Sequence, residues 1–353
     1  MVVFANFPTL EFMVNNISMA SALGSVRVDL LGGTLDLNPI NVILPNVVTL
    51  NLATSLKAKV KVSKIDFDGV EIISRDYNST DRFASKDFTK ENLQNGFFGN
   101  LNFIAQILSL FNLKSNILLE LESGSPPGAG LGGSSAMGVT CYSALAKFVG
   151  QSFDRVEAIQ KVNSLEARIL DCGPAGYQDY YPALFGGVLG LIAEPGKVVV
   201  EQLYTDELKA VLESHLTLVY SNETRNSGIN NWEVYKAFFN KDQAVRAGLA
   251  EIANLSNQAL QNIRQRKFVE LINLIALEGD ERRKLFPGIL TPTMAALHAE
   301  LKSEGSQLGM KICGAGGGGC FLITHSPSDI KQIETIVNKY HMKKLDFFVE
   351  KPL

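Results

Sequence analysis

Cysteine is scarce in this chain, and its pattern excludes several kinds of site. The 353 residues contain four scattered cysteines, with no C-x-x-C pair, at Cys141, Cys172, Cys313 and Cys320. A disulfide framework or a zinc site is therefore not expected, and a reducing, cytoplasmic compartment is favoured. We expect Cys313 and Cys320 to be packing residues, because their spacing fits no zinc pattern.

Long apolar runs and strong charge are also missing. No stretch of about 18 apolar residues occurs, so we expect no membrane span. The start, MVVFANFPTLEFMVNN, lacks a positively charged region and a small-residue cleavage site, which argues against a signal peptide. The net charge of −3 gives no basic footprint for nucleic acid. No histidine lies beside a nucleophile, so histidine catalysis has no support.

The length suggests about two domains, each of mixed secondary structure. Apolar and alternating runs predict strands at 25–31, 47–64, 116–122, 183–193, 309–313, 320–324 and 343–350. Helical spacing predicts helices at 134–149, 152–170, 241–264, 267–285, 292–304 and 327–340. This order predicts an α+β fold with domains at residues 1–200 and 201–353, the boundary falling between 190 and 215.

Two side-chain patterns favour structural interpretations. Lys57, Lys59 and Lys61 alternate and are expected on a solvated strand face, with a basic binding stripe as the alternative. An aromatic group near residue 235 is expected in the core rather than against a ligand; its members are Trp232, Tyr235, Phe238 and Phe239.

The most informative stretch is PPGAGLGGSSAMG, residues 126–138, which joins a predicted strand to a predicted helix. The first N–H groups of a helix have no internal partner, and the helix dipole favours negative charge there. Glycines let an anion approach the backbone, and serines can cap the helix or reach a metal. The stretch therefore predicts an anion site, with a tight turn before a serine-capped helix as the structural alternative.

Two familiar nucleotide motifs do not account for this stretch. The spacing Gly128-x-Gly130-x-x-Gly133 fits the G-x-G-x-x-G pattern of dinucleotide-binding folds. That pattern also requires an acidic residue closing a second strand about 20 residues later, whereas residues 154–157 fall in a predicted helix. A Walker A loop is excluded, since the chain contains no Gly-Lys-Ser or Gly-Lys-Thr.

Residues 127–136, PGAGLGGSSA, closely resemble the phosphate loop of the GHMP kinases (galactokinase, homoserine kinase, mevalonate kinase and phosphomevalonate kinase). Residues 27–36, RVDLLGGTLD, resemble the first motif of that family, and residues 311–320, KICGAGGGGC, its third. The three motifs in this order extend the resemblance over about residues 20–325. It implies a two-domain GHMP kinase fold, with a ribosomal-protein-S5-domain-2-like N-terminal domain and a ferredoxin-like C-terminal domain.

Three further stretches resemble sugar kinases of the heptose 7-phosphate kinase type: GYQDYYPALFGG (176–187), YSNETRNS (220–227) and ERRKLFPGILTP (281–292). The chain departs from that pattern at Ser25, in the spacing of residues 32–36 and at Asn222. All three departures fall in the part that is expected to bind the sugar. The resemblance implies transfer of the γ-phosphate of Mg-ATP to a hydroxyl of a sugar or sugar phosphate. A kinase for a non-sugar alcohol such as mevalonate or homoserine, and a non-catalytic nucleotide or sugar sensor, remain alternatives.

The resemblance also implies roles for individual residues. Asp179 is the candidate base and Arg27 a catalytic cation, with a structural ion pair as the alternative for Arg27. Ser135 and Glu166 are candidate Mg²⁺ ligands, although Glu166 also fits an ordinary helix surface. The predicted ATP contacts are Pro127, Gly128, Ala129, Gly130, Leu131, Gly132, Gly133, Ser134, Ser135, Gly316 and Gly317.

The predicted acceptor contacts are Asp36, Thr34, Gly33, Tyr177, Arg225 and Arg283. Asp36 is expected on the same strand as Arg27 and to accept hydrogen bonds from sugar hydroxyls. Arg225 and Arg283 would clamp a phosphate or carboxylate of the acceptor, with surface salt bridges as the alternative. No nucleic-acid or membrane partner is expected, and the chain is expected to be a monomer or a homodimer.

Overall fold

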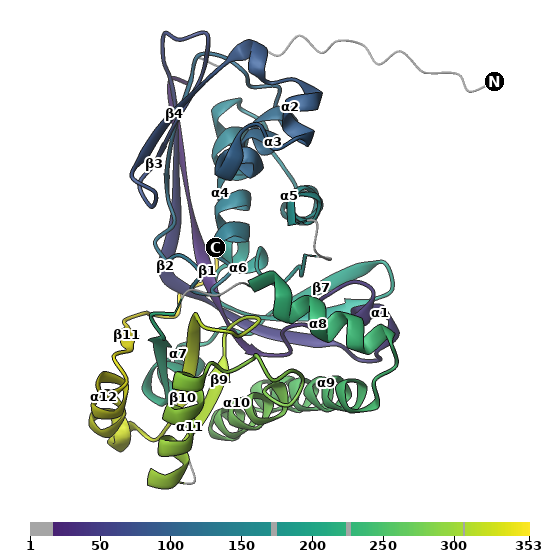
Figure 1. The fold of residues 1–353 in the computed structure, drawn as a ribbon, viewed down its shortest axis with the longest axis vertical. Helices are drawn as coiled ribbons and strands as arrows, with labels where there is room; N and C mark the ends of the chain where they lie inside the picture. The colour runs from purple at the N-terminus through teal and green to yellow at the C-terminus, as the bar shows by residue number, and fades with distance from the viewer. Residues whose placement is uncertain (1–16, 171–174, 224–226, 306–307) are drawn as a thin grey trace, which may run out of the picture.

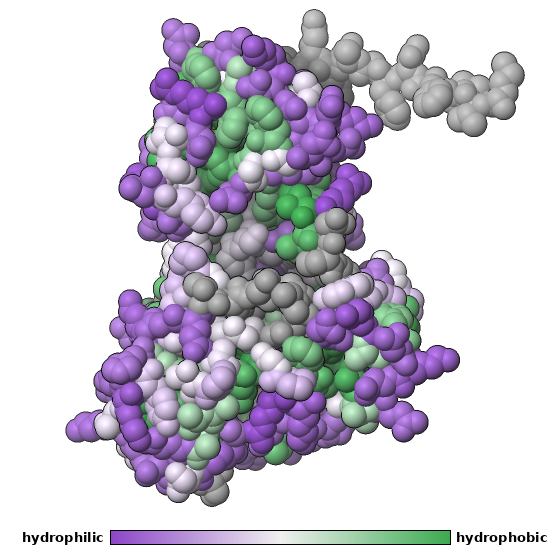
Figure 2. All heavy atoms as spheres, viewed as in Figure 1, coloured by the Kyte–Doolittle hydropathy of each residue, from purple (hydrophilic) through white to green (hydrophobic). Residues whose placement is uncertain are grey.

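A computed structural model describes residues 17–170, 175–223, 227–305 and 308–353 of the chain (Figure 1). It contains a seven-stranded and a four-stranded sheet, with helices around both. In the space-filling view the molecule is narrowest at mid-height (Figure 2). One part, built on β3, β4 and α2–α5, lies above this point, and the part built on α8–α12 lies below it. No helix among the described residues has both the length and the apolar character needed to cross a bilayer.

The first sheet has the order β4-β3-β5-β2-β6-β7, with β1 also paired to β2. Its strands are β1 (Met19–Leu31), β2 (Val48–Lys64), β3 (Gly69–Ser74), β4 (Ser79–Ala84), β5 (Ile117–Glu122), β6 (Val188–Glu194) and β7 (Lys197–Gln202). β3 and β5 are parallel, and the other pairs are antiparallel. The 17-residue β2 joins two regions, because residues 59–64 pair with β5 and residues 48–52 with β6.

The second sheet is wholly antiparallel, with the order β11-β8-β10-β9. Its strands are β8 (Leu216–Tyr220), β9 (Gly309–Ile312), β10 (Cys320–Thr324) and β11 (Lys343–Leu345). After β11 the chain returns to the first sheet, where Val349 bridges Thr54 and Pro352 bridges Gly186. The chain therefore leaves the first sheet after Gln202 and enters the second at Leu216, while residues 349–352 contact the first half again.

The helices fill the space around the sheets. They are α1 (Ile40–Ile43), α2 (Lys90–Gln94), α3 (Asn102–Leu110), α4 (Gly133–Phe148), α5 (Arg155–Leu170), α6 (Tyr181–Phe185), α7 (Asp206–His215), α8 (Ser227–Phe239), α9 (Gln243–Arg264), α10 (Phe268–Arg282), α11 (Pro292–Glu304) and α12 (Ile330–Lys339). α4 packs on β1 and β2, and α3 and α5 cover it. Its small residues allow this burial: a Cβ on Gly138 would lie 2.6 Å from the Phe103 ring.

The main core joins the two halves of the chain. It includes Leu50 and Val188 of the first sheet together with Leu260, Leu271 and Ile275 of α9 and α10. Burying such side chains contributes roughly 1.5–3 kcal/mol each. The two halves therefore share apolar burial, although β8–β10, α11 and α12 also enclose a core cluster of their own, which includes Met294, Leu297 and Phe321.

Most predicted elements are confirmed, and the differences have local causes. The predicted strand at 183–193 begins only at Val188, because Pro182 opens the short helix α6 before it. The predicted strand at 343–350 ends at Leu345. The sequence prediction named no helix at α3 or α7 and no strand at β7 or β8.

The lysine stripe is a paired strand face. Lys59 binds Glu122 and Lys61 binds Glu120 across the β2–β5 pair, while Lys57 binds Glu350. The solvated interpretation is confirmed, since these lysines already have carboxylate partners at the surface.

Four charged side chains are buried together where β1, α10 and β9 meet. Lys311 Nζ lies 2.8 Å from Asp29 Oδ2 and 3.6 Å from Glu278 Oε2. Arg282 binds Glu278, with Nε 3.1 Å from Oε1. All four are at most 2% exposed. Burial alone would raise the pKa of Asp29, but Lys311, Arg282 and Arg27 hold that pKa below its usual value.

This charge cluster predicts a large stability difference between two lysine substitutions. Lys311→Met removes one cation and leaves Asp29 buried without its closest partner, so the free energy of unfolding should fall by about 3–5 kcal/mol. Lys59→Met, at an exposed pair, should cost about 1 kcal/mol or less. Urea denaturation of both variants measures the difference. Equal small losses would show that the cluster is not stabilised by its charge pairing.

Candidate active site

The loop between β5 and α4 has a backbone that glycine favours. Gly128, Gly130 and Gly132 have φ of 68°, 75° and 69°, in the left-handed region that L side chains rarely adopt. A Cβ on Gly132 would lie 3.0 Å from the Cβ of Asp179. The glycines therefore serve both purposes expected of them, a turned backbone and a close approach of another chain segment.

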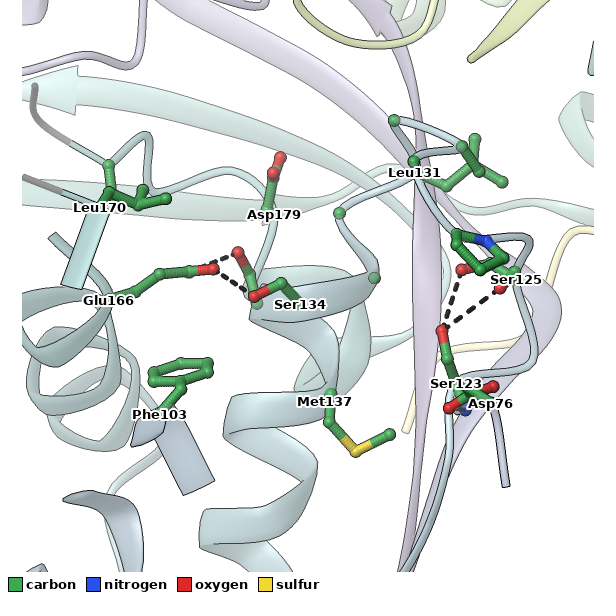
Figure 3. A pocket seen from close by; sticks show the side chains of 18 of the residues that line it. Asp76, Phe103, Ser123, Ser125, Leu131, Ser134, Met137, Glu166, Leu170 and Asp179 are labelled. Carbon is green, nitrogen blue, oxygen red and sulfur yellow. Dashed lines mark hydrogen bonds between the residues drawn. The ribbon is translucent and has the colours of Figure 1, made fainter. Parts of the chain in front are cut away.

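The serines after this loop do not cap the helix. The residue at the cap position is Gly132, and no side chain caps the first turn of α4. Ser134 and Ser135 instead donate to Glu166 on α5, at 2.6 Å to Oε1 and 2.7 Å to Oε2 (Figure 3). The first N–H groups of α4 are thus left without a side-chain cap, as an anion site at a helix N-terminus requires.

Glu166 is a buried carboxylate of α5 that faces the first turn of α4. Besides the two serines, the hydroxyl of Tyr180 donates to it. Burial raises the pKa of Glu166 above its usual value, and the three hydroxyl donors only partly oppose that shift. An acidic oxygen pair next to serine hydroxyls is a donor set that suits Mg²⁺, which prefers oxygen ligands and retains waters. The residues present therefore fit the expected metal and the anion beside it.

Arg27 connects the three sequence motifs. Its Nε and Nη2 lie 2.8 Å and 2.7 Å from Asp179 Oδ1, and its Nη1 donates to the carbonyls of Gly130 and Cys313, each at 2.6 Å. Burial would lower the pKa of Arg27, but Asp179 and Asp29 raise that pKa above its usual value. The guanidinium therefore stays charged and fixes the Asp179 carboxylate over the glycine loop.

A small polar cavity of about 70 Å³ lies beside Asp179. Asp36 contributes a buried carboxylate, whose Oδ2 accepts from the N–H of Gln178 at 3.0 Å. Arg282 donates to the carbonyl of Gly33 at 2.7 Å and to Thr34 Oγ1 at 3.1 Å. Burial, with Asp179 nearby, raises the pKa of Asp36 to about 7.

Asp36 is not on the strand that carries Arg27, contrary to expectation. β1 ends at Leu31, and the chain turns through Thr34 with a φ of 71°. This turn places Asp36 opposite Gly176, where a Cβ would lie 2.3 Å from Asp36 Oδ2. Only glycine at 176 leaves room for this carboxylate.

A larger cavity of about 470 Å³ surrounds the glycine loop. Asp76, Ser123 and Ser125 lie on one side of it, and Glu166 and Leu170 on the other (Figure 3). Both cavities are lined by Leu37, Gly176, Asp179 and Asn231. Asp179 is therefore at the boundary between a space that contains the phosphate loop and one that contains Asp36.

The third glycine motif contacts the phosphate loop directly. Cys320 N–H donates to the carbonyl of Ala129 at 2.6 Å. Gly314 and Ala315 line the small cavity, whereas Gly316 and Gly317, the predicted ATP contacts, line neither cavity. Gly317 N–H instead donates to the carbonyl of Ile289, and a Cβ on Gly316 would lie 2.4 Å from the same oxygen.

Two other predicted residues line neither cavity, and a third cannot be placed. Tyr177 packs edge-on against Tyr181, with ring centroids 6.2 Å apart. Arg283 binds Asp280 and His298 outside both cavities. Arg225 lies outside the described residues.

Arg282, the neighbour of Arg283, is the arginine that lines the small cavity, and sequence reasoning missed it. The signal was present in α10, where Leu271, Ile275, Glu278 and Arg282 follow the spacing of one helix face. Two charged residues on an apolar face indicate a buried pair. Gln178 and Asn231 were also missed, and no sequence signal distinguishes them.

Two family models match the chain in the expected order. The model described as "GHMP kinases N terminal domain" matches residues 101–187, which include the glycine loop and Asp179. The model described as "GHMP kinases C terminal" matches residues 257–343, which include α10 and the third motif.

Individual proteins show the same relationship. The L-fucokinase/L-fucose-1-P guanylyltransferase of Bacteroides fragilis is 27% identical over 93% of this chain and 37% of its own length. The mevalonate kinase of Methanothermobacter thermautotrophicus is 27% identical over 68% of this chain and 75% of its own. The chain thus spans little more than a third of the length of that fucokinase.

A solved structure titled as a D-glycero-D-manno-heptose 1-phosphate kinase from Bacteriodes thetaiotaomicron has the same fold, with a TM-score of 0.73 at 18% identity. It covers 95% of this chain and 97% of its own. The two family models, the two-domain α+β fold and the three motifs around Arg27 agree. The chain belongs to the GHMP kinase family of enzymes.

Proposed function

We propose that this protein is a cytoplasmic ATP-dependent kinase that transfers the γ-phosphate of Mg-ATP to a hydroxyl of a sugar or sugar phosphate. The observation that carries the proposal is the position of Asp179. Arg27 holds it above the glycine loop, at the boundary between the two cavities. A donor in the larger cavity and an acceptor in the smaller one would meet at this carboxylate.

The glycine loop, Pro127 to Ser135, would bind the phosphates of ATP through backbone N–H groups and the N-terminus of α4. Glu166 and Ser135 would hold Mg²⁺, with Ser134 supporting the same carboxylate. When bound, ATP would supply the phosphoryl group, and Mg²⁺ would neutralise the negative charge that develops on it. Gly316 and Gly317 would act indirectly, by shaping the loop that meets Ala129.

Asp179 would accept the proton of the acceptor hydroxyl as its oxygen attacks the phosphorus atom. Arg27 binds Oδ1, so Oδ2 is the oxygen assigned to that proton. The same guanidinium touches the carbonyl of Gly130 in the phosphate loop. Arg27 would therefore position the base and place positive charge beside the phosphoryl group being transferred.

The small cavity suits a polyhydroxy acceptor. Asp36 offers carboxylate oxygens to hydroxyl donors, and Arg282 fixes Gly33 and Thr34 around it. The similarity to the fucokinase over 93% of the chain supports a sugar, whereas the similarity to the mevalonate kinase, over 68%, keeps a non-sugar alcohol as the alternative. Acceptor contacts by Tyr177, Arg225 and Arg283 stay predictions.

ADP release with Mg-ATP, measured across free sugars, sugar phosphates, mevalonate and homoserine, tests this function. Stimulation by a sugar or sugar phosphate is expected. Stimulation by mevalonate or homoserine alone would replace the sugar assignment. ATP binding without stimulation by any acceptor would favour a sensor of the same fold.

Asp179→Asn should lower kcat by roughly 10²–10⁴-fold, because the amide cannot accept the hydroxyl proton. The KM for ATP should change little, since the loop and Glu166 hold the nucleotide. Asp68→Asn, at an exposed carboxylate that lines neither cavity, is the matched control and should retain wild-type turnover. Steady-state kinetics measure both variants. Wild-type kcat in Asp179→Asn would remove the residue from the mechanism.

The pH dependence of acceptor use should report Asp36, whose pKa is raised to about 7. Its ionised form, which accepts hydroxyl hydrogen bonds, increases as pH rises through that value. The kcat/KM for the acceptor should therefore rise from pH 6 to pH 8, by up to roughly tenfold per unit below pH 7. Asp36→Asn should raise the acceptor KM and remove this rise of kcat/KM with pH. If the variant shows the same rise, the titrating group is not Asp36.

A further inference from the structure

The aromatic residues of α8 are divided between two faces of the helix. Val234 and Phe238, one turn apart, are buried in a core cluster with Leu37, Leu249 and Ile252. Because these residues anchor one face, the residues at 232, 235 and 239 form a row along another face. We name Trp232, Tyr235 and Phe239 the α8 aromatic row.

This arrangement corrects the expectation that the whole aromatic group is core. Trp232 is 38% exposed and Phe239 is 37% exposed, whereas Phe238 is 1% exposed. The Trp232 and Tyr235 rings are stacked, with centroids 5.5 Å apart and planes 17° apart. Tyr235 in turn contacts Phe239 at 4.7 Å. The rings hold one another in place, so the exposed indole is preorganised rather than free to rotate.

Two members of the row lie in the larger cavity. Trp232 and Tyr235 line it together with Asp179, whereas Phe239 lines neither cavity. The residue before Trp232, Asn231, lines both cavities. The aromatic rings therefore begin where the two cavities meet, which is where an acceptor bound at Asp36 would leave the small cavity.

The two cavities share Asp179 and Asn231 in their linings, so an acceptor bound at Asp36 would extend past Asn231 toward Trp232 in the larger cavity. A ring sugar has hydroxyls at its edge and a face of C–H groups. The hydroxyls match Asp36 and Arg282, and the C–H face matches an exposed aromatic ring. An open-chain alcohol such as mevalonate has no such face.

From this juxtaposition we propose that Trp232, supported by Tyr235, forms a stacking platform for the apolar face of a ring-form sugar acceptor. The inference rests on the proposed kinase function and deepens it, because it assigns a cyclic acceptor and the residue that selects it. Trp232 acts in binding and specificity, and phosphoryl transfer itself is left to Asp179 and Arg27.

The chain provides a direct probe, because Trp232 is its only tryptophan. Its fluorescence can be followed with a non-hydrolysable ATP analogue present. The probes added are L-fucose, D-glucuronate, D-glycero-D-manno-heptose, the phosphates of L-fucose and D-glucuronate, and mevalonate. A saturable emission change with at least one ring sugar, and none with mevalonate, is expected. No change with any ring sugar would overturn the proposal.

Kinetics of three variants test whether the contact selects the acceptor. Trp232→Ala should raise the KM for the best ring-sugar acceptor on the order of tenfold, with kcat and the KM for ATP little changed. Trp232→Phe should restore most of the affinity, because it keeps a ring. Phe348→Ala, at an aromatic side chain that is 64% exposed and lines neither cavity, is the matched control and should behave as wild type.

The remaining outcomes separate the two proposals. A rise in the KM for ATP alone would assign the platform to the nucleotide base and overturn the inference. A loss of kcat with unchanged acceptor KM, or equal effects in Phe348→Ala, would indicate a structural role and also overturn it. A sugar-dependent emission change without turnover would support the platform while contradicting the kinase function.

Discussion

The contact of Arg27 with Asp179 is the interaction on which the rest of the site depends. One buried guanidinium binds Asp179 and also donates to the carbonyls of Gly130 and Cys313. A charged group is buried at such a position only where its partners repay its desolvation. Asp179, the glycine loop and the third glycine motif are thereby fixed relative to one cation.

The buried cluster of Asp29, Glu278, Arg282 and Lys311 lies next to this centre. Asp29 lies two residues after Arg27 on β1 and is bound to Lys311, at the start of the third motif. Arg282 joins the group through Glu278 and also reaches Gly33 and Thr34 in the small cavity. The lining of the small cavity is therefore continuous with the buried charges that join β1, α10 and β9.

The sequence was sufficient for the long elements and the three motifs, but not for details that depend on packing. The α4 helix and the glycine loop before it could be predicted because glycine clusters and helix spacing are local signals. Arg282 shares a helix face with Leu271, Ile275 and Glu278, which separates it from Arg283, but only packing shows that this face reaches the small cavity. The sequence does not show that Trp232 is exposed and Phe238 buried, because contacts with the core determine which face of α8 is buried.

The contacts between distant segments also determine when the site can form. The carbonyl of Ala129 accepts from Cys320, and Arg27 reaches Cys313, 286 residues further along the chain. Contacts of such large sequence separation form slowly, because the intervening loop must close first. During synthesis the first half can build its sheet and its glycine loop early. The carbonyl of Ala129 receives the N–H of Cys320 only after the last quarter of the chain has emerged, so the glycine loop reaches its final contacts late in folding.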